Sequence, residues 1–238
     1  MRSKLFIPYI IVFGLITLAE MVGEHVFHSG GSSILLFVTK PLLMPVLIIL
    51  LAKATRLKQA FDKLMLIGLG FGWLGDVFLM FNNNDLFVFG LASFLICHIL
   101  YIFAFINNIR KSSYTLSFIN RFILGILPLF YLIVIYSYLY SYITKNPLFE
   151  PFLIPVSVYC IAIFTMSLFA LWRIGSTNRQ SAALIIGGAF IFMLSDSLIA
   201  LNKFVHPFEH ANLYIMFLYC LAQLLFVLGT IQHYKPGK

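Results

Sequence analysis

The chain has 238 residues, of which 61% are hydrophobic and only 10% are charged, and its mean hydropathy is +0.99. These values exclude an ordinary soluble domain and indicate a polytopic membrane protein. The formal net charge of +8 comes mostly from basic residues that lie between the apolar segments or outside them.

Eight apolar segments approach the roughly 20 residues that a helix needs to cross the hydrocarbon core of a bilayer. In chain order they cover residues 5–22, 34–52, 64–81, 86–106, 122–142, 150–172, 182–202 and 211–231. Little is left for a soluble domain, so the sequence predicts a single transmembrane domain over residues 1–238. Backbone groups in lipid must be satisfied internally and no alternating strands are present, so the predicted fold is an all-α bundle of eight transmembrane helices.

Lysine and arginine are distributed unevenly between the two ends of these segments. Thirteen of the 16 lie before the first segment, in alternate loops or after the last, and the other three are Lys40, Lys145 and Lys203. Basic residues accumulate on the cytoplasmic side of a membrane, so both termini are predicted to be cytoplasmic. The positive charge is therefore interpreted as an anchoring signal, and no nucleic-acid partner is expected.

The first segment follows two basic residues, as a secretory signal does, but no clear small-residue cleavage site comes after it. We interpret it as a retained helix and residues 20–33 as a short external loop. The three cysteines fall inside predicted helices and are odd in number, which argues against a disulfide framework.

Two aspartates stand inside apolar segments: Asp76 in FGWLGDVFLM and Asp196 in AFIFMLSDSLIA. A carboxylate at bilayer depth is costly, so it is by default a functional-site hypothesis with a partner nearby. A small residue, Gly75 or Ser195, precedes each of them. We therefore predict that the two carboxylates share one site. The alternative is that each makes a structural hydrogen bond to a neighbouring helix.

Two motifs recur along the chain and suggest an internal repeat. KPLLMP at residues 40–45 has a counterpart in EPFLIP, and GLGFGWLGDVFLMFN aligns with GAFIFMLSDSLIALN, which ends at Asn202. A repeat of residues 1–110 and 118–238 would give two similarly oriented four-helix halves, related by an axis along the membrane normal. That axis would bring the two aspartates to the same depth. The spacing between the motifs differs between the halves, so a chance match is the alternative.

A ligand-binding site is predicted around the two aspartates. With a helical rise of about 1.5 Å per residue, each aspartate lies roughly 8 to 9 Å from the outer end of its helix. Lysine ammonium groups there would bind an anionic group, and amide or phenol groups would supply neutral hydrogen bonds. The predicted binding residues are Lys40, His98, Tyr101, Asn202, Lys203, Tyr219 and Gln223. The inner half of the bundle is predicted to hold only its basic loops.

Simpler interpretations exist for several of these residues. Lys40 lies near a helix end, where a long amine can extend to the membrane interface. Glu20 is interpreted as an interfacial residue at a helix exit. A histidine such as His98 is more often a hydrogen-bonded residue inside a bundle than a ligand or a base.

Four histidines in predicted external loops raise the alternative of a metal site: His25, His28, His206 and His210. Zinc is bound by such ligands, but loop histidines beside Glu24 and Glu209 are also ordinary solvated residues. No phosphate-binding glycine loop, nucleophile elbow or Cys–His pairing is present in the sequence. Neither a metal nor another cofactor is predicted.

Six motifs, in this order, resemble the YhhN-like lysoplasmalogenase family of integral membrane proteins: KPLLMP, GWLGDVFLM, FGLASFLICHILY, FTMSLFAL, GAFIFMLSDSLIALNKF and YCLAQLLFVLG. The resemblance runs over residues 40–229, and its most specific parts are the G-D and S-D pairs and the histidine motif between them. It implies eight transmembrane helices and hydrolysis of the vinyl ether of lysoplasmalogens to a fatty aldehyde and glycerophosphoethanolamine or glycerophosphocholine. It also places the family's two acidic positions on Asp76 and Asp196.

Vinyl ether chemistry gives two such acids a role. Protonation at carbon produces an oxocarbenium ion. Glycosidases pass through a transition state that resembles such an ion, and they use one protonated and one ionised carboxyl group. Two carboxyl groups close together in a low dielectric titrate apart, which keeps one of them protonated. We therefore hypothesise that one of Asp76 and Asp196 is the general acid and that the other stabilises the cation and orients water. The sequence does not decide which is which.

Two other functions fit some of these patterns. A proton-coupled secondary transporter of a small solute or lipid also has repeated halves, proline-containing helices and intramembrane aspartates. A lipid-binding protein without catalysis would use the aspartates for packing. The expected partners are a lysophospholipid substrate and membrane lipids, and the expected location is the cytoplasmic membrane of a bacterium.

Overall fold

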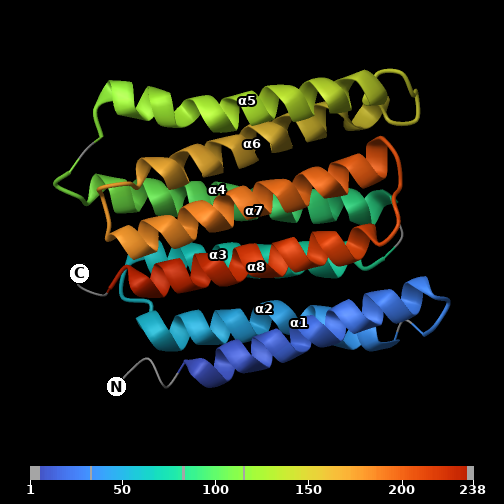
Figure 1. Cartoon of the computed structure of the whole chain (residues 1–238), viewed down its shortest axis with the longest axis horizontal. Coiled ribbons are helices and arrows are strands. Elements are labelled where there is room, and N and C mark those ends of the chain that lie inside the picture. The colour runs from blue at the N-terminus through green and yellow to red at the C-terminus, as the bar shows by residue number, and fades with distance from the viewer. Residues whose placement is uncertain (1–5, 33, 82–83, 115, 235–238) are drawn as a thin grey trace.

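The computed structural model describes residues 6–32, 34–81, 84–114 and 116–234, and in these ranges all regular secondary structure is helical (Figure 1). The elements are α1 (Ile7–His28), α2 (Ile34–Thr55), α3 (Ala60–Leu79), α4 (Asn84–Arg110), α5 (Phe118–Ile143), the short 3-10 helix η2 (Glu150–Phe152), α6 (Leu153–Trp172), α7 (Arg179–Phe204) and α8 (Ala211–Gln232). The predicted all-α fold is confirmed, and the described ranges contain eight long helices.

The helices run alternately up and down along the long axis of the bundle (Figure 1). α5 and α6 form one edge, α1 and α2 form the other, and α3, α4, α7 and α8 lie between them. Helices next to each other in sequence pack together within residues 7–110 and again within residues 118–232. Contacts of α2 with α8 and of α4 with α6 join these two groups.

The surface of the described bundle suits a lipid environment. Seven of its eight helices are long and apolar enough to cross a membrane, and the chain is an integral multi-pass membrane protein. The remaining helix, α3, carries three charged residues in its 20: Asp62, Lys63 and Asp76. Large apolar side chains are widely exposed, as on α5, where Phe118 is 83% exposed and Phe122 is 66% exposed. Such exposure is unfavourable in water and ordinary against lipid tails.

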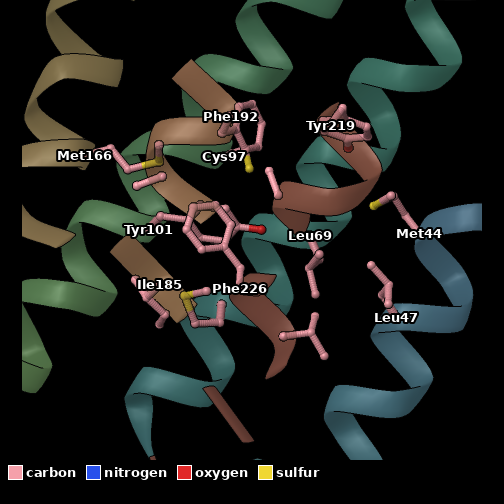
Figure 2. Close-up of a cluster of buried hydrophobic side chains, with 14 of the residues drawn as sticks. Met44, Leu47, Leu69, Cys97, Tyr101, Met166, Ile185, Phe192, Tyr219 and Phe226 are labelled. Atoms are coloured by element: carbon pink, nitrogen blue, oxygen red, sulfur yellow. The ribbon is translucent and has the colours of Figure 1, made fainter. Parts of the chain in front are cut away.

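Glycines on α3 allow aromatic side chains from α4 and α8 to approach its backbone closely. A Cβ at Gly68 would collide with the ring of Tyr101, and a Cβ at Gly75 would lie 2.7 Å from the ring of Phe94. Small residues let helices pack closely where lipid gives no hydrophobic driving force between them. The core that results draws side chains from seven helices, with Leu69, Tyr101 and Phe226 among those in Figure 2.

Two prolines inside α2 create a specific bond to α3. Pro45 has no N–H, so the carbonyl of Pro41 one turn earlier lacks its usual helical partner. The indole Nε1–H of Trp73 donates to that carbonyl oxygen over 2.9 Å. The KPLLMP motif is therefore joined to the helix that carries Asp76.

The prediction of an external loop at residues 20–33 was wrong over most of its length. α1 continues through Glu20 and Glu24 to His28, and in this stretch it buries Glu20, Gly23 and Glu24 against the bundle. His25 and His28 therefore lie in the last turns of a helix, whereas His206 and His210 lie between α7 and α8 as predicted.

The prediction that the inner half holds only basic loops was also wrong. Arg173, directly after α6, is 0% exposed; its Nε donates to Asn108 Oδ1 over 3.0 Å and its Nη2 to Ser181 Oγ over 3.2 Å. Burial lowers the pKa of this guanidinium to about 9, which leaves it charged at neutral pH. At the same end, Tyr234 donates to the carboxylate of Asp62 over 2.6 Å. A polar network thus ties the ends of several helices together opposite the predicted site.

Candidate active site

A cavity of about 470 Å³ lies at the end of the bundle opposite Arg173. We call it the polar cavity. The predicted site residues that line it are Lys40, Asp76, Asn202, Lys203, Asp196 and Tyr219. They come from four helices, α2, α3, α7 and α8, so it is the tertiary fold that brings these residues together.

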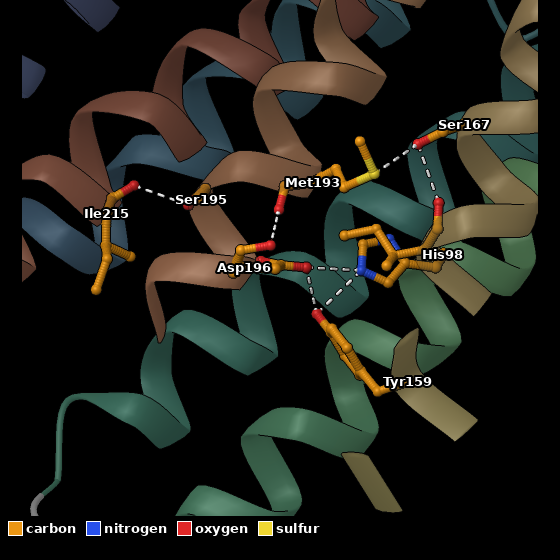
Figure 3. A network of polar contacts seen from close by, with 9 residues as sticks. His98, Tyr159, Ser167, Met193, Ser195, Asp196 and Ile215 are labelled. Carbon is orange, nitrogen blue, oxygen red and sulfur yellow. Dashed lines mark hydrogen bonds and ion pairs between the residues drawn. The ribbon is translucent and has the colours of Figure 1, made fainter. Parts of the chain in front are cut away.

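Asp196 on α7 is held by two side chains from other helices (Figure 3). The hydroxyl of Tyr159 on α6 donates to Asp196 Oδ2 over 2.5 Å. His98 Nε2 on α4 lies 3.0 Å from the same oxygen and 3.0 Å from the Tyr159 hydroxyl. Since the tyrosine proton points to the carboxylate, the imidazole Nε2–H donates to it as well. Asp196 Oδ2 therefore accepts hydrogen bonds from two other helices.

Asp76 on α3 has a different environment. It is 3% exposed, and its Oδ2 is buried without a hydrogen-bond partner. The hydroxyl oxygen of Tyr219, on the lining of the same cavity, is also buried without a partner. Asp76 and Asp196 are close enough to interact electrostatically. The two carboxyl groups thus share a cavity but differ in the number of their donors.

Lys40 extends into the polar cavity rather than away from the bundle. Its Nζ lies 3.9 Å from Glu24 Oε1, and its side chain is 12% exposed. Glu20, one turn before Glu24, is 0% exposed and accepts a hydrogen bond from Thr39. The interpretation of Glu20 as an interfacial residue was therefore wrong, because α1 packs this face against α2.

The other cavity residues have partners as well. Asn202 Oδ1 accepts a hydrogen bond from the backbone N–H of Phe208 over 3.2 Å, which orders the turn after α7. Lys203 Nζ lies 4.9 Å from the centre of the Phe87 ring. Both side chains stand on the last turn of α7, two turns beyond Asp196.

Three of the predicted site residues do not line the polar cavity. His98 lies behind Asp196, as described above, and is fully buried. Tyr101 donates to Gln223 Oε1 over 2.7 Å, and both are fully buried in the core. Gln223 Nε2 has no partner and faces Gly72, where the Tyr219 hydroxyl also lies.

Sequence analysis missed two residues of this region. Tyr159 is one of 12 tyrosines and stands in an apolar segment, so no local signal separates it from packing residues. Glu24 was assigned to a loop, and a helical period extended past residue 22 would have placed it one turn beyond Glu20 on the same face.

A narrow apolar crevice of about 50 Å³ meets the polar cavity at Asp196. Its walls come from α4, α5, α6 and α7, with Leu79 from the end of α3, and include Leu139, Val156 and Ile163. Asp196 therefore stands between a charged chamber and an apolar one. This arrangement matches an amphiphile whose reactive bond lies at the junction of its head and tail.

The histidines considered for zinc do not form a metal site among the described residues. His28 and His210 have ring centres 4.3 Å apart, and those of His25 and His210 are 5.8 Å apart. His28 and His210 line a second hollow at this end of the bundle, next to Glu24.

Comparison with known proteins agrees with the resemblance found in the sequence. The chain is 29% identical to lysoplasmalogenase TMEM86A of Bos taurus over 173 residues, which cover 71% of this chain and 66% of that protein. It is 32% identical to lysoplasmalogenase TMEM86B of Homo sapiens over 151 residues, covering 63% of this chain and 56% of that protein. This chain thus matches less than two thirds of the length of these relatives. No solved structure matches. The sequence model of the YhhN family matches residues 35–230, and the chain belongs to that family.

Proposed function

We propose that the protein is a membrane hydrolase that cleaves the vinyl ether of lysoplasmalogens to a fatty aldehyde and glycerophosphoethanolamine or glycerophosphocholine. The observation that carries the proposal is the pair of buried carboxyl groups, Asp76 and Asp196, that line the polar cavity. Asp196 also lines the apolar crevice, so the two spaces meet at this residue. The names of the relatives support the same reaction.

The two aspartates have separate roles in this proposal. Asp76, which has a buried oxygen without a donor, is the protonated general acid. Asp196 accepts from Tyr159 and His98, so it stays ionised and stabilises positive charge. This assigns the roles that the sequence left open.

The reaction then follows in three steps. Asp76 gives its proton to the vinyl carbon distant from the ether oxygen, and the electron pair of the double bond forms the new C–H bond. The resulting oxocarbenium ion lies against the Asp196 carboxylate. Water adds to its carbon and returns a proton to Asp76, and the hemiacetal collapses to the aldehyde and the glycerol hydroxyl. The net change is the addition of one water molecule.

Substrate placement uses the two chambers. The phosphate lies near Lys40 or Lys203, the vinyl ether lies between the aspartates, and the hydrocarbon tail leaves through the apolar crevice past Val156. The crevice is narrow, so the tail displaces side chains of α5, which has few buried residues. Tyr219 supplies a hydroxyl to the cavity.

The deciding experiment measures fatty-aldehyde release from a defined lysoplasmalogen by the purified protein in detergent. Asp76→Asn and Asp196→Asn variants are assayed beside it after their melting temperatures are shown to match wild type. Loss of a general acid lowers the rate by roughly 10²- to 10⁴-fold, which we expect for Asp76→Asn, and loss of an electrostatic stabiliser lowers it by roughly 10²- to 10³-fold, which we expect for Asp196→Asn. Wild-type rates in either folded variant would refute the acid pair. An inactive wild type that moves solute across sealed vesicles would identify a carrier instead.

We also propose that α3 crosses the membrane with the other seven helices and that both termini are cytoplasmic. Among the described basic residues, nine stand at the end of the bundle where α1 begins, and Lys40, Lys145 and Lys203 stand at the other. Lys58→Cys and Lys145→Cys variants treated in intact cells with a membrane-impermeant maleimide test this, with labelling expected at 145 alone. The bacterial cytoplasmic membrane stays a prediction.

A further inference from the structure

A second hollow of about 340 Å³ adjoins the polar cavity, and we call it the vestibule. It shares Phe27, Asn202 and Asn212 with the polar cavity, so the two spaces are neighbours. Glu24 and His28 come to it from the end of α1, and Phe208 and His210 come from the turn before α8.

Glu24 is the carboxylate of the vestibule, and it is only 6% exposed. Its cationic neighbour is Lys40, whose Nζ is 3.9 Å away, beyond the length of a hydrogen bond. A buried carboxylate normally accepts several close donors. Glu24 therefore keeps capacity to accept hydrogen bonds from a ligand, while Lys40 reaches the polar cavity on the other side.

Aromatic rings complete the lining of the vestibule. Phe27, His28, Phe208 and His210 all contribute to it, and the rings of His28 and His210 lie 4.3 Å apart between centres. Ring faces beside a carboxylate are the groups that bind ammonium ions in proteins, whether primary or quaternary. The chemistry of this hollow therefore fits a cation.

The charges of the two connected spaces point to a ligand without net charge. With Asp76 protonated, the lysines and ionised carboxylates that line them are Lys40, Lys203, Asp196 and Glu24, two of each sign. A phosphate on Lys40 would draw that cation away from Glu24 and leave a buried carboxylate unpaired, which is costly. An ammonium group on the same ligand would replace the lost partner.

We propose that Glu24 and the rings around it bind the ammonium group of a zwitterionic lysophospholipid, while Lys40 binds its phosphate. This inference rests on the proposed function and adds the residue that selects the head group. A lysolipid with a bare phosphate head binds more weakly, because it satisfies Lys40 and leaves Glu24 without a cation.

The test uses ether lipids that cannot be hydrolysed, so that it does not depend on catalysis. Calorimetry in detergent gives the Kd of 1-O-alkyl-glycerophosphoethanolamine, 1-O-alkyl-glycerophosphocholine and 1-O-alkyl-glycerophosphate of equal chain length. A hydrogen bond or ion contact to a charged group corresponds to about a tenfold change in Kd. We expect wild type to bind both zwitterions at least about tenfold more tightly than the phosphate lipid, and Glu24→Gln to abolish the difference.

Glu209→Gln is the matched control, since it removes an exposed carboxylate from the adjoining turn and should keep the preference. Phe208→Leu is the second variant, and we expect it to weaken binding of the choline lipid most. Equal Kd values in wild type, or a preference that survives Glu24→Gln, would overturn the inference. Aldehyde release from vinyl ether lipids by the same preparations tests the hydrolase separately.

Discussion

Tyr159 and Asp196, on adjacent helices α6 and α7, are joined by a hydrogen bond of 2.5 Å from the phenol to carboxylate Oδ2. The bond orients the carboxylate at the boundary between the polar cavity and the apolar crevice. It also gives a carboxylate at membrane depth a donor that does not carry positive charge.

The first prediction concerns this bond. Tyr159→Phe removes the hydroxyl and keeps the ring, and we expect kcat/KM for aldehyde release to fall about tenfold, because hydrogen bonds to charged groups contribute about 1.5–3 kcal/mol. Tyr136→Phe is the control, since Tyr136 hydrogen-bonds Ser157 on α6 rather than Asp196. Equal rates in the two variants would show that the Tyr159 hydroxyl does not assist Asp196.

Lys40 is predicted to bind the phosphate. Lys40→Met keeps the apolar stem and removes the charge, so we expect the Kd for a 1-O-alkyl lysophospholipid to rise about tenfold. Lys145→Met, in an exposed loop, should bind as wild type does. Unchanged affinity in Lys40→Met would remove the phosphate role of this residue.

The apolar crevice is predicted to select for the tail. Val156 is 4% exposed and lines it, so Val156→Phe narrows the path of the hydrocarbon chain. Relative hydrolysis rates for lysoplasmalogens of increasing chain length should then shift toward short chains. Val158→Phe, two residues later on the exposed face of α6, should leave the chain-length profile as it is. Identical profiles for both variants would place the tail elsewhere.

The glycines of α3 give a paired stability test. Gly68→Ala would push a methyl group into the ring of Tyr101, and overpacking of this kind typically costs about 1–3 kcal/mol. Gly70 has no neighbouring atom within 4 Å of a Cβ, so Gly70→Ala should be neutral or stabilise by up to about 1 kcal/mol. Melting temperatures in detergent should therefore move in different directions, and a similar fall in both would contradict the packing argument.

Stability should depend on pH through His233, which follows the last turn of α8. Burial, with Arg173 nearby, lowers the pKa of His233 from its ordinary value of 6.5. Below 6.5 the unfolded chain therefore binds the proton before the folded one does, so stability rises with pH in this window and falls as the solution is acidified. The melting temperature of wild type should drop more between pH 7 and pH 5 than that of His233→Gln. Parallel curves would show that His233 does not titrate differently in the two states.

Much of this architecture follows from local patterns, and the departures have physical causes. The lengths of the apolar segments predict eight helices. The free-energy cost of placing a charged side chain in lipid marks Asp76 and Asp196 as candidate site residues. Tyr159 could not be predicted, because its role depends on the crossing of α6 and α7. Arg173 was assigned to a basic loop, since a sequence does not show that aromatic rings and Asn108 enclose it.

The two halves suggested by the sequence remain a prediction. Helix pairing within residues 7–110 has the same order as within residues 118–232, and the contacts of α2 with α8 and α4 with α6 are the exchange that a two-fold axis would produce. These contacts support the repeat.

The bond from Trp73 to the carbonyl of Pro41 bears on the route by which the proposed lysolipid would reach the carboxylates. It fixes the register of α2 against α3 next to Lys40, so separation of these two helices would break a partly buried hydrogen bond. α5 packs mainly on α6 and presents most of its surface outward. α5 is the least buried of the candidate membrane spans, so under the proposed function we expect a lysolipid diffusing in the bilayer to enter tail first on that side.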